Sequence, residues 1–349
     1  MGGSITNKEF GSDFHLCTES KWQTNNQNFF LKNTTLFLSG RTALYALLKQ
    51  GIKKHNWKTV YFPSYYCQEV VKFIQDLTID VKIYDFNPFL DTIDKDFKIN
   101  DNPTSVIINV DFFGLKHHLF LSIKKAVLID DLTHNLEAIK TSTADYIFGS
   151  LRKELPIPSG GFLASSNGFK LPKGKQSRLA NSIAIKKFTA MYLKKRYLEG
   201  LSNDKDTFRE IFIESEENLE GKLKSAKIPK TAKVLLQNLD ITQILKAKKE
   251  NINQALSNLK IDKDLVLNSQ KTRLGAGLVL QLKSKKNRDE LKSYLISKKI
   301  YPAVLWPGQL TKRDIEIEDK VLFLHLDYRY NTEDINLIIN KLNFYFSNE

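Results

Sequence analysis

Between residues 35 and 165 the sequence alternates short apolar runs with segments of helical periodicity, and this alternation constrains the fold more than any other feature. The first run, TLFLS, is followed by RTALYALLKQGIKK, whose apolar residues recur at helical spacing. Continuous apolar strands separated by helices are typical of a parallel sheet covered on both faces. The sequence therefore predicts an α/β domain whose mostly parallel sheet is sandwiched by helices. The strand-like runs are TLFLS (35–39), TVYFP (59–63), VKIYDF (81–86), SVIINVDFF (105–113), AVLIDD (126–131) and DYIFGS (145–150).

A second unit is expected from about residue 240. The segment ITQILKAKKENINQALSNL has helical spacing, and strand-like and helical segments then alternate to the end: GLVLQL, NRDELKSYLISKKI, YPAVLW, KVLFLHL and TEDINLIINKLNFYF. Few strands mixed with helices predict a small α+β domain. The intervening residues 166–235 are more polar, with helical patterns at 181–200 and 216–226. We expect an N-terminal segment (1–30), a large domain (31–238) and a small C-terminal domain (239–349).

The net charge and the cysteine content exclude several classes of protein. The net charge of +14 is spread over helix-like segments without a basic arm, so we favour solvated helix faces over nucleic-acid binding. Two cysteines, Cys17 and Cys67, exclude a disulfide framework and a four-cysteine zinc site, and we expect no metal. No apolar run reaches the ~18–20 residues of a membrane helix. We therefore expect a cytoplasmic protein that binds neither membrane nor nucleic acid.

Residues 39–42 (SGRT) stand where the first strand gives way to a helix. The N-terminus of a helix carries unpaired N–H groups and partial positive charge, which suit a phosphate. Gly40 permits close backbone approach, and Thr42 offers a hydroxyl. Taken alone, the segment is better explained as an ordinary helix cap.

Two further positions suggest chemistry at neighbouring strand ends. Asp130 and Asp131 close an apolar strand, with His134 one helical turn later. Lys153 follows the next strand, before a glycine pair. Each has a simple alternative, since Asp131 can cap a helix and Lys153 can lie on the surface. A phosphate-binding turn, a carboxylate and a lysine, in this order along the chain, are what pyridoxal phosphate (PLP) requires.

The sequence resembles the DegT/DnrJ/StrS group of fold-type-I PLP enzymes, most of which are sugar aminotransferases. The resemblance runs over most of the chain and rests on several segments in the family's order: SGRTALYALL, VYFPSYYCQEVV, INVDFFG, IDDLTH, SLRKELPIPSGGFL, SKKIYPAVLWP and LFLHLDYRYNTEDINLI. It implies PLP as cofactor, a symmetric homodimer, and transfer of an amino group from an amino acid, commonly glutamate, to a keto group. The expected acceptor is a nucleotide-linked sugar of cell-surface polysaccharide or secondary-metabolite synthesis.

The resemblance also implies roles for individual residues. Lys153 would be the Schiff-base lysine, Asp131 would pair with the pyridine nitrogen, and His134 would lie near the phenolic oxygen. The phosphate would be held by Gly40, Arg41, Thr42 and Ser150. The residue covering the ring is left open among Tyr65, Tyr66 and Cys67: alignment favours Cys67, and stacking favours a tyrosine.

The sequence departs from the family pattern in three places. Asp130 replaces the usual glutamate, lysines in LKAKKEN stand where an arginine is common, and a Gly-Tyr-Asn segment that reaches the partner's phosphate is not found. Sugar contacts lie in such variable parts, so cofactor binding is better supported than aminosugar synthesis. The alternatives are a PLP-binding regulator without turnover and a different PLP reaction, such as sugar dehydration, in which a histidine replaces the lysine.

Overall fold

The computed structural model contains the whole chain. The parts it describes are residues 8–24, 28–88, 99–117, 120, 122–217, 223–270 and 274–348.

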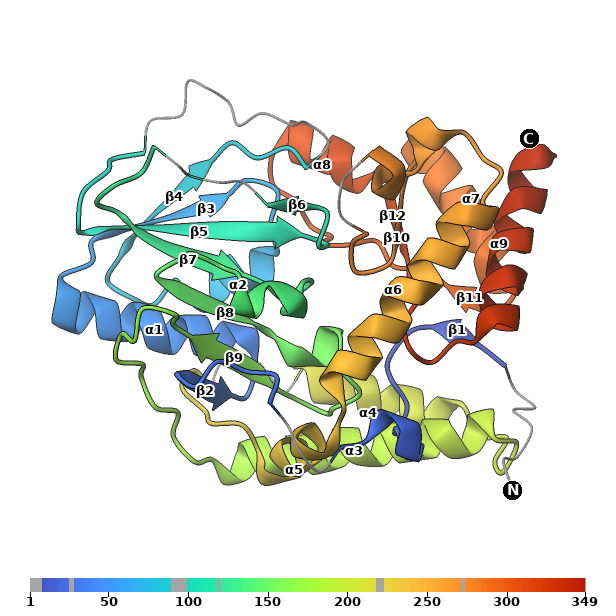
Figure 1. Ribbon diagram of the computed structural model, residues 1–349, viewed down its shortest axis with the longest axis horizontal. Coiled ribbons are helices and arrows are strands. Elements are labelled where there is room, and N and C mark those ends of the chain that lie inside the picture. The colour runs from blue at the N-terminus through green and yellow to red at the C-terminus, as the bar shows by residue number, and fades with distance from the viewer. Residues whose placement is uncertain are drawn as a thin grey trace.

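A large sheet forms the centre of the molecule (Figure 1). Within the described residues it has eight strands. Neighbouring strands from β8 to β4 are all parallel, whereas β9 is antiparallel to both β8 and β2. The mostly parallel sheet expected from the sequence is therefore confirmed. In spatial order the strands are β2 (Thr34–Phe37), β9 (Gly161–Ala164), β8 (Tyr146–Ser150), β7 (Val127–Asp131), β5 (Ser105–Phe112), β3 (Thr59–Pro63) and β4 (Asp80–Tyr84), with the short β6 (Lys116–His117) beside β5.

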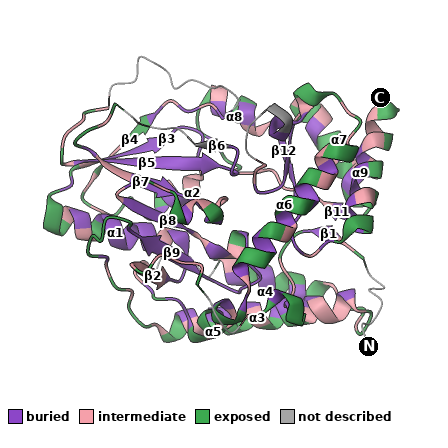
Figure 2. Cartoon of the chain, viewed as in Figure 1, coloured by how far each residue is buried: buried purple, intermediate pink, exposed green. Residues whose placement is uncertain are grey.

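Both faces of the central strands are buried, which explains why these strands are mostly apolar. Successive residues of a strand point to opposite faces. In β8, Ile147 and Phe148 belong to two separate apolar cores, and both are fully buried. Figure 2 shows buried residues along the strands and exposed residues on the outer surfaces of the helices. Each face therefore requires its own cover of helices and loops.

Helix α1 (Gly40–His55) packs on β8 and β9. It begins with a capping box, in which Ser39 and Thr42 each bond the other's backbone. Its Leu44, Leu47 and Leu48 are fully buried. The other helices of this part are α2 (Gln68–Phe73), α3 (Arg178–Leu198), α4 (Asp206–Glu217) and α5 (Lys230–Asn238), with short 3₁₀ turns at Ser20–Trp22, Leu136–Lys140 and Leu151–Lys153.

The C-terminal part has its own small core and sheet. Strands β10 (Leu278–Gln281) and β12 (Val321–Leu324) pair antiparallel, and helices α6, α7 and α9 contribute to the apolar cluster around them. The N-terminal strand β1 (Phe10–Gly11) pairs with β11 (Ile300–Tyr301), so the start of the chain packs against its last third. The division at residues 30 and 238 stays a prediction. The remaining elements are α6 (Ile241–Asn258), α7 (Lys285–Ser297), α8 (Lys312–Glu318) and α9 (Thr332–Ser347), with 3₁₀ turns at Lys263–Leu265 and Leu267–Gln270.

Two predicted segments differ from the structure. The helix expected over 216–226 is wrong at 223–226, where the Ala226 carbonyl instead accepts a hydrogen bond from the Leu38 amide; residues 218–222 lie outside the described parts. Of the strand expected over 301–306, only Tyr301 belongs to a strand, β11, and Ala303 forms an isolated β-bridge to Phe323. Pro302 has no N–H to donate, and Trp306 has a positive φ of 53°, so a regular strand cannot continue there.

None of the helices in the described parts has the length and apolar character needed to cross a membrane.

Candidate active site

A cavity of about 700 Å³ lies at the carboxyl ends of β7 and β8, beside the N-terminus of α1. Segments near β12 and the loop before α8 contribute its other side, including Trp306, Phe323 and His325. This is the position at which parallel sheets bind ligands. Most of the predicted site residues line it, namely Gly40, Arg41, Tyr66, Cys67, Asp131, His134, Ser150 and Lys153.

Glycines bring the N-terminus of α1 against the ends of β8 and β9. A side chain at Gly161 would place its Cβ 2.1 Å from the Ser39 carbonyl carbon, and a Cβ at Gly40 would lie 3.0 Å from the Ser150 nitrogen. Only glycine permits this approach. The first turn of α1 therefore opens onto the cavity next to Ser150, where its backbone N–H groups suit an anion.

Thr42, predicted to bind phosphate, lies outside the cavity lining. Its hydroxyl accepts a hydrogen bond from the Ser39 amide (2.9 Å) and donates one to the Ser39 carbonyl (2.8 Å). The hydroxyl therefore caps α1 and, from outside the cavity, stabilises the helix turn whose N–H groups face it.

Asp131 and Asp130 point in different directions, as neighbours in a strand must. Asp131 lines the cavity. Its Oδ2 accepts a hydrogen bond from the Tyr66 hydroxyl (2.5 Å), and its Oδ1 accepts from the Thr133 hydroxyl (2.6 Å) and amide (3.0 Å). Burial raises the pKa of Asp131 while these hydrogen bonds oppose the shift. Asp130 instead accepts hydrogen bonds from Asn109 and Ser142.

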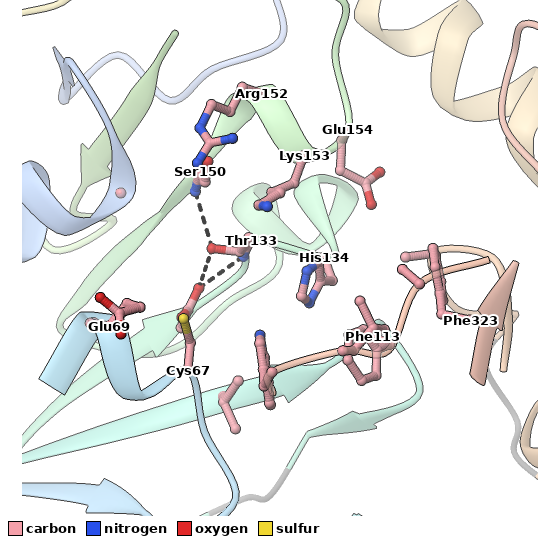
Figure 3. Close-up of a pocket in the computed structure, with 18 of the residues that line it drawn as sticks. Cys67, Glu69, Phe113, Thr133, His134, Ser150, Arg152, Lys153, Glu154 and Phe323 are labelled. Atoms are coloured by element: carbon pink, nitrogen blue, oxygen red, sulfur yellow. Dashed lines mark hydrogen bonds between the residues drawn. The ribbon is translucent and has the colours of Figure 1, made fainter. Parts of the chain in front are cut away.

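Lys153 is placed at the end of the 3₁₀ turn after β8 and is exposed to the cavity. Figure 3 shows its amine on the side of the cavity where Thr133 and His134 lie. Within the described parts of the chain, the amine has no hydrogen bond or ion pair. The neighbouring charge of Arg152, followed by burial, lowers the pKa of Lys153 to about 8. About a tenth of its amine is therefore unprotonated at pH 7, far more than for an ordinary lysine.

His134 forms part of an aromatic wall. Its ring stacks on Phe113, with centroids 4.8 Å apart and an interplanar angle of 29°, and lies 5.8 Å from Trp306. Burial, together with the charge of Lys153, lowers the pKa of His134 to about 3, so the ring is neutral at pH 7. Its buried Nδ1 has no hydrogen-bond partner among the described residues.

The candidates for covering a ring are separated by the structure. Tyr65 lies outside the lining, and its hydroxyl donates to the Leu305 carbonyl (3.1 Å). Tyr66 is fully buried and bonded to Asp131, and Cys67 caps α2 at the cavity edge. Which of them covers a bound ring stays a prediction.

Sequence reasoning missed several residues of the cavity. Arg152 and Thr133 stand inside the quoted motifs but were given no role. Glu216 and His325 come from distant segments and carry no local signal of their own. The lining residues that the sequence did not predict include Thr133, Arg152, Glu154, Glu216, Lys248, Trp306 and His325.

Solved structures of sugar aminotransferases share this fold. The Helicobacter pylori aminotransferase PseC, involved in pseudoaminic acid biosynthesis, superposes with a TM-score of 0.63 at 13% identity, covering 98% of this chain and 100% of its own. Spr1654 of Streptococcus pneumoniae, assigned as a sugar aminotransferase, gives a TM-score of 0.61 at 13% identity, covering 98% of each chain.

The aminotransferase TlmJ of Streptoalloteichus hindustanus also gives a TM-score of 0.61, at 11% identity, covering 97% of this chain and 99% of its own. At such identities the similarity establishes the shared fold. No protein-family model matches the chain, and no curated protein matches it significantly.

Proposed function

We propose that the protein is a PLP-dependent aminotransferase that moves an amino group from an amino acid, commonly glutamate, to a keto group of a nucleotide-linked sugar. One observation carries the proposal. Lys153, Asp131 and the N-terminus of α1 come from separate parts of the chain and meet at one cavity. The shared fold with sugar aminotransferases, one of them solved in a PLP form, supports it.

The cavity fits PLP at three points. The first turn of α1 lines the cavity beside Ser150, so Gly40, Arg41 and Ser150 would hold the phosphate. The Asp131 carboxylate would hold the ring nitrogen in its protonated form. The Lys153 amine would bind the aldehyde carbon. When bound, PLP withdraws electrons from the carbon that bears the donor's amino group.

The residues of this chain would carry the proton transfers. With its pKa lowered to about 8, the Lys153 Nζ can accept a proton and return it at neutral pH, as a general acid–base group must. The buried Asp131 is oriented by Thr133 and Tyr66, so its carboxylate is fixed before a ligand arrives. Phe113 and Trp306 exclude water from the side of the cavity where His134 lies.

The sugar acceptor, the assembly and the location are parts of the same proposal. A cavity of about 700 Å³ has room for a ligand beside the cofactor, and the net charge of +14 favours a phosphorylated one. We propose a homodimer, the usual closed assembly of soluble enzymes. Both described cysteines are free thiols, which favours a cytoplasmic location.

Absorption spectroscopy tests the proposal. The purified protein with PLP is expected to show the visible band of lysine-bound PLP, and glutamate is expected to bleach it by half-transamination. Lys153→Ala should abolish the band, while Lys286→Ala, at a lysine whose side chain is 82% exposed, should retain it. A band that survives in Lys153→Ala would rule Lys153 out. A band that glutamate never bleaches would favour a PLP-binding regulator.

A further inference from the structure

Beside Lys153, the cavity contains an ion pair that the proposed reaction does not use. Arg152 lines the cavity and holds Glu216 of α4 in a two-point contact: Nη1 to Oε1 is 3.0 Å and Nη2 to Oε2 is 2.8 Å. Lys187 of α3 also bonds the Glu216 carboxylate. The Arg152 Nε is buried and has no hydrogen-bond partner among the described residues.

The charges in this cluster do not balance. Burial alone would raise the pKa of Glu216, but Arg152, Lys187 and Lys153 together lower it to about 2. Three cations thus act on this carboxylate, and Asp13, which lies outside the cavity lining, acts on Lys187, so cations outnumber carboxylates in the cluster. Elsewhere in the cavity, Lys248 and Glu154 form a one-to-one pair. A buried excess of positive charge is costly unless another anion shares it, so the Arg152 cluster has capacity for a second anion.

We propose that Arg152 binds the carboxylate of the amino donor and that Glu216 occupies this position until the donor enters. The inference rests on the proposed function, because it assumes that a donor amine reacts at Lys153. In an α-amino acid the amine and the carboxylate are separated by one carbon. Arg152 is the chain neighbour of Lys153 and faces the same cavity, so a donor can reach both.

The chemistry favours a carboxylate over the cofactor phosphate. The planar guanidinium fork matches two carboxylate oxygens, and Arg152 already holds a carboxylate in this way. The phosphate has its own place at the N-terminus of α1. Glu216 can release Arg152 without being left unpaired, because it keeps Lys187. Its side chain is 37% exposed, which lowers the cost of the exchange.

The test compares Arg152→Gln and Glu216→Gln with a matched control, Glu214→Gln. Glu214 lies on the same helix and pairs with Lys186, the neighbour of Lys187, but both partners are about half exposed and neither lines the cavity. Each protein is loaded with PLP and titrated with L-glutamate and with n-butylamine, which lacks a carboxylate. Binding of glutarate, a dicarboxylate without an amine, is measured by calorimetry, and PLP affinity by dialysis.

Arg152→Gln is expected to raise the half-saturating glutamate concentration about 10- to 100-fold and to weaken glutarate binding similarly. Because the same substitution raises the pKa of Lys153, Schiff-base formation should weaken for PLP and n-butylamine as well, but both responses should change less than the response to glutamate. Glu216→Gln should lower the half-saturating glutamate concentration, and Glu214→Gln should leave it unchanged.

Two results would overturn the inference. If Arg152→Gln weakens PLP binding as much as glutamate binding, Arg152 serves the phosphate. If Glu216→Gln raises the glutamate requirement as Arg152→Gln does, Glu216 braces Arg152 and is not displaced. If the parent protein shows no reaction with glutamate, the proposed function fails, and glutarate binding to the parent and Arg152→Gln proteins still decides the role of Arg152.

Discussion

The free amine of Lys153 should titrate far below the range of an ordinary lysine. In the structure, the charge of Arg152 and burial lower the pKa of Lys153 from 10.5 to about 8. Both causes disfavour the ammonium form, so the amine loses its proton at lower pH. Raising the pH of the PLP-free protein through 8 should therefore switch on the reactivity of Lys153, while ordinary lysines stay protonated.

The size of the effect follows from the two pKa values. At pH 7, a pKa of about 8 leaves roughly a tenth of Lys153 as free amine, whereas 10.5 leaves roughly 0.03%. The reactive fraction is thus about 300-fold larger. Arg152→Gln removes the largest cause of the shift and should move the midpoint upward, toward 10.5.

Competitive labelling with an amine-reactive reagent, read by mass spectrometry at a series of pH values, measures this titration. Lys286, whose side chain is 82% exposed, serves as the internal reference in every sample. We expect a labelling midpoint near pH 8 for Lys153 in the parent protein and a higher one in Arg152→Gln. A midpoint near 10.5 in the parent would refute the reasoning, as would a midpoint that Arg152→Gln leaves unchanged.

Three further substitutions, with Ser284→Ala as a control, test the scaffold of the cavity. Tyr66→Phe removes the hydrogen bond to the buried Asp131 carboxylate and should lower the free energy of unfolding by about 1.5–3 kcal/mol, measured by urea denaturation; an unchanged midpoint would show that this bond contributes nothing. Gly161→Ala forces a Cβ against the Ser39 carbonyl and should lower the free energy of unfolding by about 1–3 kcal/mol and weaken PLP binding. A PLP affinity equal to that of the parent protein, measured by dialysis, would contradict this prediction. Ser39→Ala and Ser284→Ala each remove a helix cap worth about 0.5–2 kcal/mol, yet only the first should weaken PLP binding; equal PLP affinities would contradict the role of the α1 terminus.

The sequence by itself determined the sheet and the order of the motifs. Strand-like runs at 59–63, 105–113 and 126–131 correspond to β3, β5 and β7 within a residue or two, because a strand buried on both faces has to be apolar throughout. Chain order then placed the predicted anion site, carboxylate and lysine at the same edge of the sheet. The strands and the motif order depend on short stretches of sequence, so the spacing of apolar residues is enough to predict them.

Only the tertiary structure decided where the side chains point and what they meet. The Thr42 hydroxyl turns back to cap its own helix, and Tyr66 reaches Asp131 across 65 positions of sequence. Arg152 meets Glu216 from 64 positions away. The Arg152–Glu216 pairing depends on how α4 lies against the turn after β8, and no periodicity in either segment encodes it. The framework of the cavity was therefore predictable from the residues, whereas its charge network is a consequence of packing.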